Sequence, residues 1–157
     1  MLSHKLIQCI QDHSEQITGA IIDRIRHDPE LARIGRLPAS ELRQWGHALL
    51  KNLGAWLAGD DREVMARHYE TLGKTRHEED IPLHECVRSL HILKYEIVDY
   101  GRNQGFPQSS IEIYAEEEFE HRVDRFIDFL VYHLVRGYEG AMKTAREHGK
   151  PAAAARA

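Results

Sequence analysis

Apolar residues recur every three to four positions along most of the chain, which is the spacing that places them on one face of an α-helix. Glycine and proline fall mostly between these periodic stretches, where they end helices. The pattern predicts about five helices and no strands, at approximately 3–26, 40–58, 61–78, 82–104 and 110–148. We therefore expect one all-α domain over residues 1–148, a single compact bundle with a long C-terminal helix, and a flexible tail at 149–157.

The last two predicted helices have unusual apolar surfaces. The helix that begins near Pro82 carries one continuous stripe and a weaker second face that includes Val87 and Val98. Such a helix usually lies at the centre of a bundle or is shared with another subunit. The final helix would be roughly 58 Å long, at 1.5 Å per residue, unless Gly137 and Gly140 bend it. Phe126 lies in its apolar stripe and is expected to be fully buried.

Composition excludes several classes of protein. Of the 157 residues, 42% are apolar and 29% are charged, a balance typical of a folded domain. The net charge of −4 provides no basic surface for nucleic acid or anionic membranes. No apolar run approaches the ~20 residues that cross a bilayer, and the N-terminus lacks a signal peptide's apolar segment. Cys9 and Cys86 form no CxxC pair, so we expect a reduced, cytoplasmic protein.

Histidine is unusually frequent, with 11 residues. Helical-wheel positions place His13, His68 and His133 on or beside the apolar stripes of three different helices. One interpretation is a partly buried imidazole that bonds a carbonyl or carboxylate. The other is a ligand to haem or a metal ion, because neutral imidazole is a common donor to both. We predict a ligand pocket around these three residues and assign it no metal and no cofactor.

Recognisable catalytic motifs are missing from the sequence. Glu118 and His121 have the Glu-x-x-His spacing of di-iron bundles, but such bundles need that motif twice, and a solvated acidic face is the simpler interpretation. There is no glycine-rich phosphate loop, no His-Glu-x-x-His and no Gly-x-Ser-x-Gly. We therefore predict no catalytic residue and expect that the protein is not an enzyme.

Two segments, 72–94 (LGKTRHEEDIPLHECVRSLHILK) and 123–139 (VDRFIDFLVYHLVRGYE), carry a family resemblance. Together with the opening helix and Asp28-Pro-Glu-Leu31, they resemble the N-terminal sensor domain of RsbT co-antagonist proteins, the RsbRD N-terminal family. The resemblance covers about residues 3–145 and implies a globin-like fold without haem that dimerises and senses signals for stressosome-like switches. The phosphorylatable STAS domain that usually follows is not among these residues, so we expect the chain to act through a separate partner.

These observations favour a dimeric, non-enzymatic sensor or interaction domain in bacterial signal transduction. The expected partners are a second copy of the chain and a kinase, phosphatase or STAS-domain protein. The predicted two-fold interface uses Val87, His91 and Val98, or the outer face of the last helix around Phe129 and Tyr132. The alternative is a haem- or metal-binding helical protein that uses the inward-facing histidines.

Overall fold

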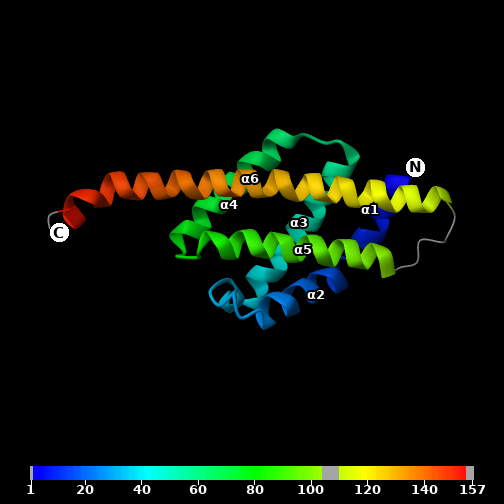
Figure 1. Cartoon of the computed structure of the whole chain (residues 1–157), viewed down its shortest axis with the longest axis horizontal. Coiled ribbons are helices and arrows are strands. Elements are labelled where there is room, and N and C mark those ends of the chain that lie inside the picture. Colours follow the sequence, from blue (N-terminus) through cyan, green and yellow to red (C-terminus); the bar gives the residue numbers. More distant parts are fainter. Residues whose placement is uncertain (1, 104–109, 155–157) are drawn as a thin grey trace.

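The computed structural model describes residues 2–103 and 110–154 of the chain. These residues form six α-helices, one short 3-10 helix and no strand (Figure 1), which confirms the all-α prediction. The elements are α1 (Leu2–Asp12), α2 (Ser14–His27), η1 (Ile34–Arg36), α3 (Ala39–Ala58), α4 (Arg62–Glu78), α5 (Leu83–Asn103) and α6 (Ser110–Ala154).

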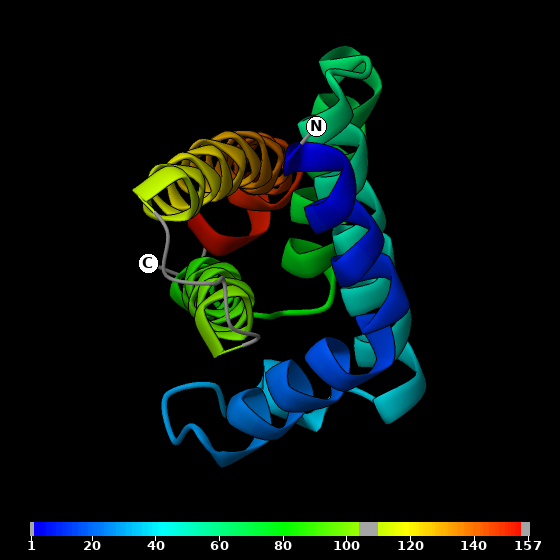
Figure 2. The ribbon, with the colours of Figure 1, turned by 90° about the vertical axis from the view of Figure 1, so that its right-hand side faces the viewer.

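The long helix α6 organises the bundle. It packs against α4 and α5, while α2 packs against α3 and α5, and α1 lies on α3 (Figures 1 and 2). Its C-terminal end projects past the other helices (Figure 1). The helix is continuous through Gly137 and Gly140 and extends to Ala154, six residues beyond the predicted end at His148. The backbone of most of the expected tail is therefore helical, and 155–157 lie outside the described residues.

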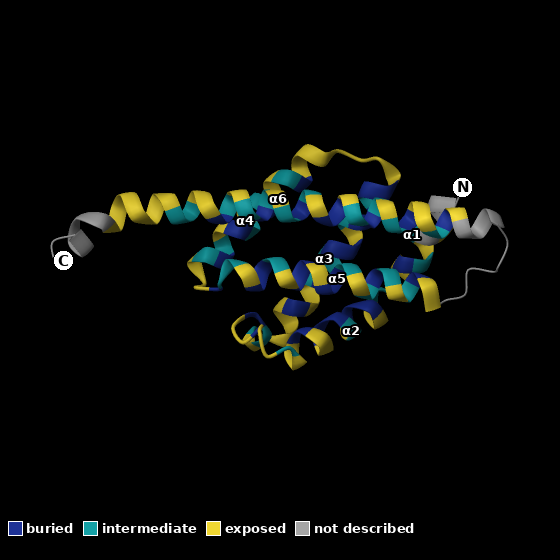
Figure 3. Cartoon of the chain, in the orientation of Figure 1, coloured by how far each residue is buried: buried dark blue, intermediate teal, exposed yellow. Residues whose placement is uncertain are grey.

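The core lies where the inner faces of the helices meet, and the projecting end of α6 carries mainly exposed residues (Figure 3). Phe126 is fully buried, as predicted, and its ring centroid lies 5.7 Å from that of Trp56 on α3. Other fully buried side chains come from α2, α3, α4 and α5, among them Ile21, Leu53, Tyr69 and Leu90. One apolar core therefore joins α6 to the rest of the chain.

The predicted N-terminal helix is in fact two helices that meet at His13, so the prediction of one continuous helix is wrong. His13 has φ −114° and ψ 18°, outside the helical region. Its imidazole Nδ1 donates to the Cys9 carbonyl at 2.8 Å, and the same carbonyl accepts the His13 backbone N–H at 3.1 Å. The bend lets α1 lie on α3 while α2 reaches both α3 and α5 (Figure 2). No glycine or proline marks this break in the sequence.

The buried face of α4 also differs from the prediction. The sequence pattern predicts an apolar stripe of Val64, Met65 and Leu72 with His68 at its centre. Met65 is buried as expected, but Val64 is 58% exposed. The other buried residues of α4 are Tyr69, Gly73 and Arg76. The cause is the contact with α6, which is centred on Gly73.

At this contact the backbones of α4 and α6 approach each other directly. A Cβ atom on Gly73 would lie 2.1 Å from the Leu134 carbonyl oxygen, and one on Gly137 would lie 1.9 Å from the Glu70 carbonyl oxygen. Only glycine fits at such a distance, so each helix supplies a glycine where the other passes. The crossing therefore fixes which side of α4 faces inward.

A buried carboxylate holds the connection between α2 and α3. Glu85 near the start of α5 is 3% exposed. Its side-chain oxygens accept the backbone N–H groups of Arg33 at 3.2 Å and of Ile34 at 3.0 Å, at the beginning of η1. The carboxylate thus satisfies two amides that the surrounding chain leaves without helical partners.

Candidate functional site

The three histidines predicted to share a pocket lie in different surroundings. His13 sits at the junction of α1 and α2, with its ring centroid 5.4 Å from that of Tyr100. His133 on α6 is half-buried and faces α4. His68 is exposed, so its predicted inward orientation is wrong, for the same reason that the α4 face is shifted. Across 2–103 and 110–154, no three metal-ligating side chains gather at one place.

His133 belongs to a small charged cluster at the α4–α6 crossing. Its Nδ1 lies 3.7 Å from one carboxylate oxygen of Glu70, whose other oxygen lies 3.3 Å from Nε of Arg136. The imidazole is flanked by the rings of Phe129 at 4.5 Å and Tyr132 at 5.0 Å between centroids. The cluster therefore adds side-chain contacts from α4 to α6 beside the backbone contact at Gly137.

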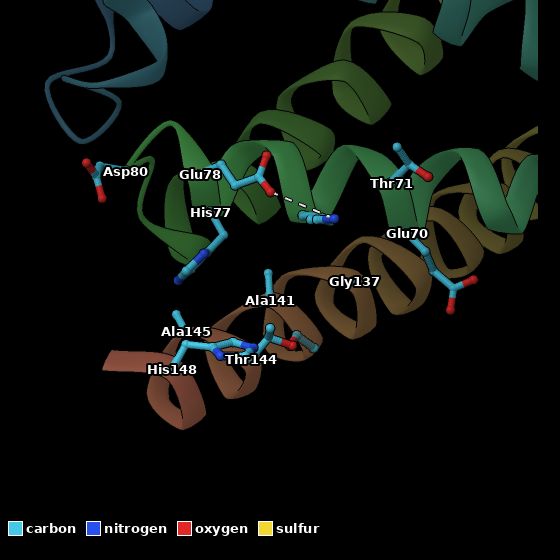
Figure 4. Close-up of a pocket in the computed structure, with 12 residues that line it drawn as sticks. Glu70, Thr71, His77, Glu78, Asp80, Gly137, Ala141, Thr144, Ala145 and His148 are labelled. Carbon is cyan, nitrogen blue, oxygen red and sulfur yellow. Dashed lines mark hydrogen bonds and ion pairs between the residues drawn. The ribbon is translucent and has the colours of Figure 1, made fainter. Parts of the chain in front are cut away.

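A groove of about 780 Å³ runs between the C-terminal halves of α4 and α6 (Figure 4). His77 from α4 and His148 from α6 lie on its two sides, and Ala141 and Thr144 contribute small side chains from α6. Its charged groups are largely exposed, as the 3.9 Å pair between Lys74 and Glu78 illustrates. The groove is therefore wide and solvated, and it lacks a buried polar anchor for a small ligand.

A smaller pocket of about 280 Å³ lies between α3 and α4. We call it the Arg76 pocket, and it is lined by Glu41, Gln44, Trp45, Ala48, His68, Tyr69, Leu72 and Arg76. Arg76 is only 6% exposed, and its Nη1 donates to a carboxylate oxygen of Glu79 at 2.8 Å. The predicted pocket residue His68 thus does line a pocket, but from an exposed position and without His13 or His133.

The electrostatics around the Arg76 pocket follow from burial. Burial raises the pKa of the Cys86 thiol to about 11, although the nearby charge of Arg76 opposes the shift. Burial likewise raises the pKa of Tyr69, whose phenol interacts with Asn52. Both groups are therefore protonated at neutral pH, and neither supplies a nucleophile or a base.

Sequence reasoning missed Arg76, because a lone arginine on a helix is usually exposed. The signal that could have found it is the spacing of Tyr69, Gly73 and Arg76. Steps of four and three residues place all three on one side of α4. Counting glycine as a contact residue would have identified this side as the buried one.

The residues predicted for the interface lie on two surfaces. On α5, His91 is exposed and Val98 is half-buried. On α6, Tyr132 is 61% exposed, whereas Phe129 is half-buried with its ring centroid 5.1 Å from that of Trp56. We call Trp56, Phe129, Tyr132 and His133 the aromatic patch. Their role in an interface stays a prediction.

Comparison with models of known protein families shows the family of the chain. The family model described as the RsbT co-antagonist protein rsbRD N-terminal domain matches residues 15–150. The chain belongs to this family. The match covers α2 to α5 and most of α6, and it confirms the resemblance noted in the sequence. Comparison with curated proteins and with solved structures gives no match, so a globin-like fold stays a prediction.

Membership of the RsbRD N-terminal family indicates a domain of stressosome-type signalling. Such signalling depends on protein partners. No helix within the described residues has the length and apolarity that a bilayer span requires. The candidate surfaces for this chain are therefore the Arg76 pocket, the groove between α4 and α6, and the aromatic patch.

Proposed function

We propose that this chain is a non-enzymatic sensor and interaction domain that works as a homodimer in the bacterial cytoplasm. It passes its signal to a separate protein, which is a kinase, a phosphatase or a STAS-domain protein. The observation that carries the proposal is the family match over residues 15–150, which covers nearly all of the helical bundle.

The aromatic patch supports dimerisation through α6. Tyr132 exposes most of its ring, while Phe129 and His133 beside it are half-buried. Aromatic side chains are enriched at the centres of protein interfaces, where they contribute much of the binding energy. In a two-fold dimer the same patch occurs on both subunits, so a single substitution acts twice.

Size-exclusion chromatography with light scattering tests this proposal. The wild type should be a dimer at tens of micromolar, and Tyr132→Lys should shift it to a monomer. Tyr114→Lys is a matched control, because Tyr114 is also on α6, is 73% exposed and lies far along the helix from the patch. Circular dichroism should show the same helical content in all three proteins.

A wild type that is strictly monomeric at these concentrations would contradict the proposed homodimer. A dimer that Tyr132→Lys leaves intact would move the interface to the other predicted surface, around His91 and Val98 on α5. Lysine substitutions at Val98 and His91 would then be the next measurement.

A further inference from the structure

We propose that the Arg76 pocket binds a small organic monocarboxylate with an apolar or aromatic body. This inference rests on the proposed function, since it takes the chain to be a sensor of a small ligand. It adds the chemical class of that ligand.

The first observation is a buried arginine in the lining of the pocket. Arg76 is more than nine-tenths buried, which is rare for an arginine, and the contact given for its side chain is the ion pair with Glu79. The hydrogen bond to Glu79 uses Nη1, whereas a guanidinium presents five N–H donors in a planar fork. Such a fork matches the two oxygens of a carboxylate, and the low dielectric around it strengthens the interaction.

The second observation is the chemistry of the remaining walls. Trp45, Tyr69, Leu72 and Ala48 give the pocket two aromatic rings and two aliphatic surfaces. Its volume of about 280 Å³ equals that of about nine water molecules at about 30 Å³ each. These dimensions fit a single-ring acid, whose body displaces water from the apolar walls while its carboxylate reaches Arg76.

The third observation limits the ligand to one negative charge. Glu41, in the first turn of α3, also lines the pocket and is exposed at its rim. Glu79 already offsets part of the charge of Arg76. A second carboxylate on the ligand would meet Glu41, so dicarboxylates and inorganic phosphate should bind less well than monocarboxylates.

Isothermal titration calorimetry with benzoate tests the proposal on the full chain. We expect saturable binding of one benzoate per chain, with a dissociation constant of about 1 mM or tighter. Benzamide has the same shape without the charge, and phthalate adds a second carboxylate. Both should bind at least 10-fold more weakly than benzoate, as should inorganic phosphate.

Two variants locate the site. Arg76→Met should weaken benzoate binding at least 10-fold, and Arg88→Met is the matched control, since Arg88 is a half-exposed arginine that pairs with Asp28 on another surface. Because loss of Arg76 also removes the contact with Glu79, a second variant, Ala48→Phe, fills the pocket and leaves the guanidinium in place. Ala48→Phe should reduce benzoate binding by a similar factor.

Absence of saturable benzoate binding by the folded wild type up to 10 mM would overturn the proposal. So would equal affinities for benzoate, benzamide and phosphate, or full affinity in folded Ala48→Phe. These results are distinguishable from failure of the proposed function. A dimer that does not bind benzoate loses the ligand assignment alone, and a monomer that binds benzoate loses the dimer alone.

Discussion

Replacement of Gly137 by alanine should separate α4 and α6, because the backbone of α4 lies directly against this glycine. The new Cβ would lie 1.9 Å from the Glu70 carbonyl oxygen and 2.7 Å from the Glu70 Cα. Ordinary contacts of a Cβ begin near 3.4 Å, so α4 and α6 would have to move apart by about 1.5 Å. The obstacle is backbone, so no side-chain rotation relieves the clash.

The expected cost is the balance of two destabilising contributions and one stabilising contribution. Overpacking in a well-packed contact costs about 1–3 kcal/mol and occasionally more. Alanine recovers about 1 kcal/mol over glycine through its helix propensity. Separation of the helices also stretches the contact between Glu70 and Arg136, which is 3.3 Å long. We therefore expect Gly137→Ala to lower the free energy of unfolding by about 1–2 kcal/mol.

Gly140→Ala is the matched control for this measurement. Gly140 lies three residues further along α6, and a Cβ there would meet nothing within 4 Å. This variant should gain up to about 1 kcal/mol from helix propensity alone. Urea unfolding followed by far-UV circular dichroism gives both values, and equal m-values would show that the same surface is exposed on unfolding. A Gly137→Ala protein as stable as Gly140→Ala would refute the contact between α4 and α6.

Three further predictions test other parts of the fold. Phe126→Ala should cost about 3–5 kcal/mol in urea unfolding, because a fully buried ring leaves a cavity, and a loss below 1 kcal/mol would contradict its central position. Glu85→Gln should cost about 1–3 kcal/mol in the same assay, since an amide oxygen serves the two backbone N–H groups of the η1 turn less well than a carboxylate; unchanged stability would show that these bonds are dispensable. The hydrogen bond from the Arg88 guanidinium lowers the pKa of the Asp28 carboxyl in the folded protein. Below the ordinary pKa of an aspartate the unfolded chain therefore binds more protons than the folded one, and the free energy of unfolding falls as the pH drops through the lowered pKa. Thermal melts from about pH 5 to about pH 3 should fall less steeply for Asp28→Asn than for the wild type, and parallel curves would exclude this contribution.

The helices could be predicted from the sequence because each has a periodic apolar stripe and most are separated by glycine, proline or a capping residue. The break at His13 could not be predicted in this way. It depends on the hydrogen bond from the His13 imidazole to the Cys9 carbonyl. It also depends on packing, because α1 contacts α3 whereas α2 contacts both α3 and α5. These are tertiary contacts, and the apolar stripe continues through the bend.

The prediction of the inward-facing residues of α4, and with it the candidate pocket, was wrong for a related reason. A hydropathy pattern records apolar side chains, whereas the contact of α4 with α6 depends on the absence of a side chain at Gly73 and Gly137. Because the pattern does not register that contact, the inferred face of α4 is rotated from the observed one, although Met65 belongs to both. The pattern therefore placed His68 inside, whereas the structure exposes it, and it gave no sign that Arg76 is buried.

The same crossing joins the two surfaces to which we assign function. One side of α4 supplies Tyr69 and Arg76 to the pocket, and Glu70 and Gly73 beside them contact α6 at 133–138, next to Tyr132. A ligand that moves α4 should move α6 as well, because the backbones of the two helices are in direct contact at Gly73 and Gly137 with no side chains between them. Linkage then requires that benzoate alter the dimer dissociation constant by the same factor by which dimerisation alters benzoate affinity. Dilution series by light scattering with and without 10 mM benzoate measure this factor. A factor of one, with both binding events intact, would show that the crossing transmits nothing between the pocket and the patch.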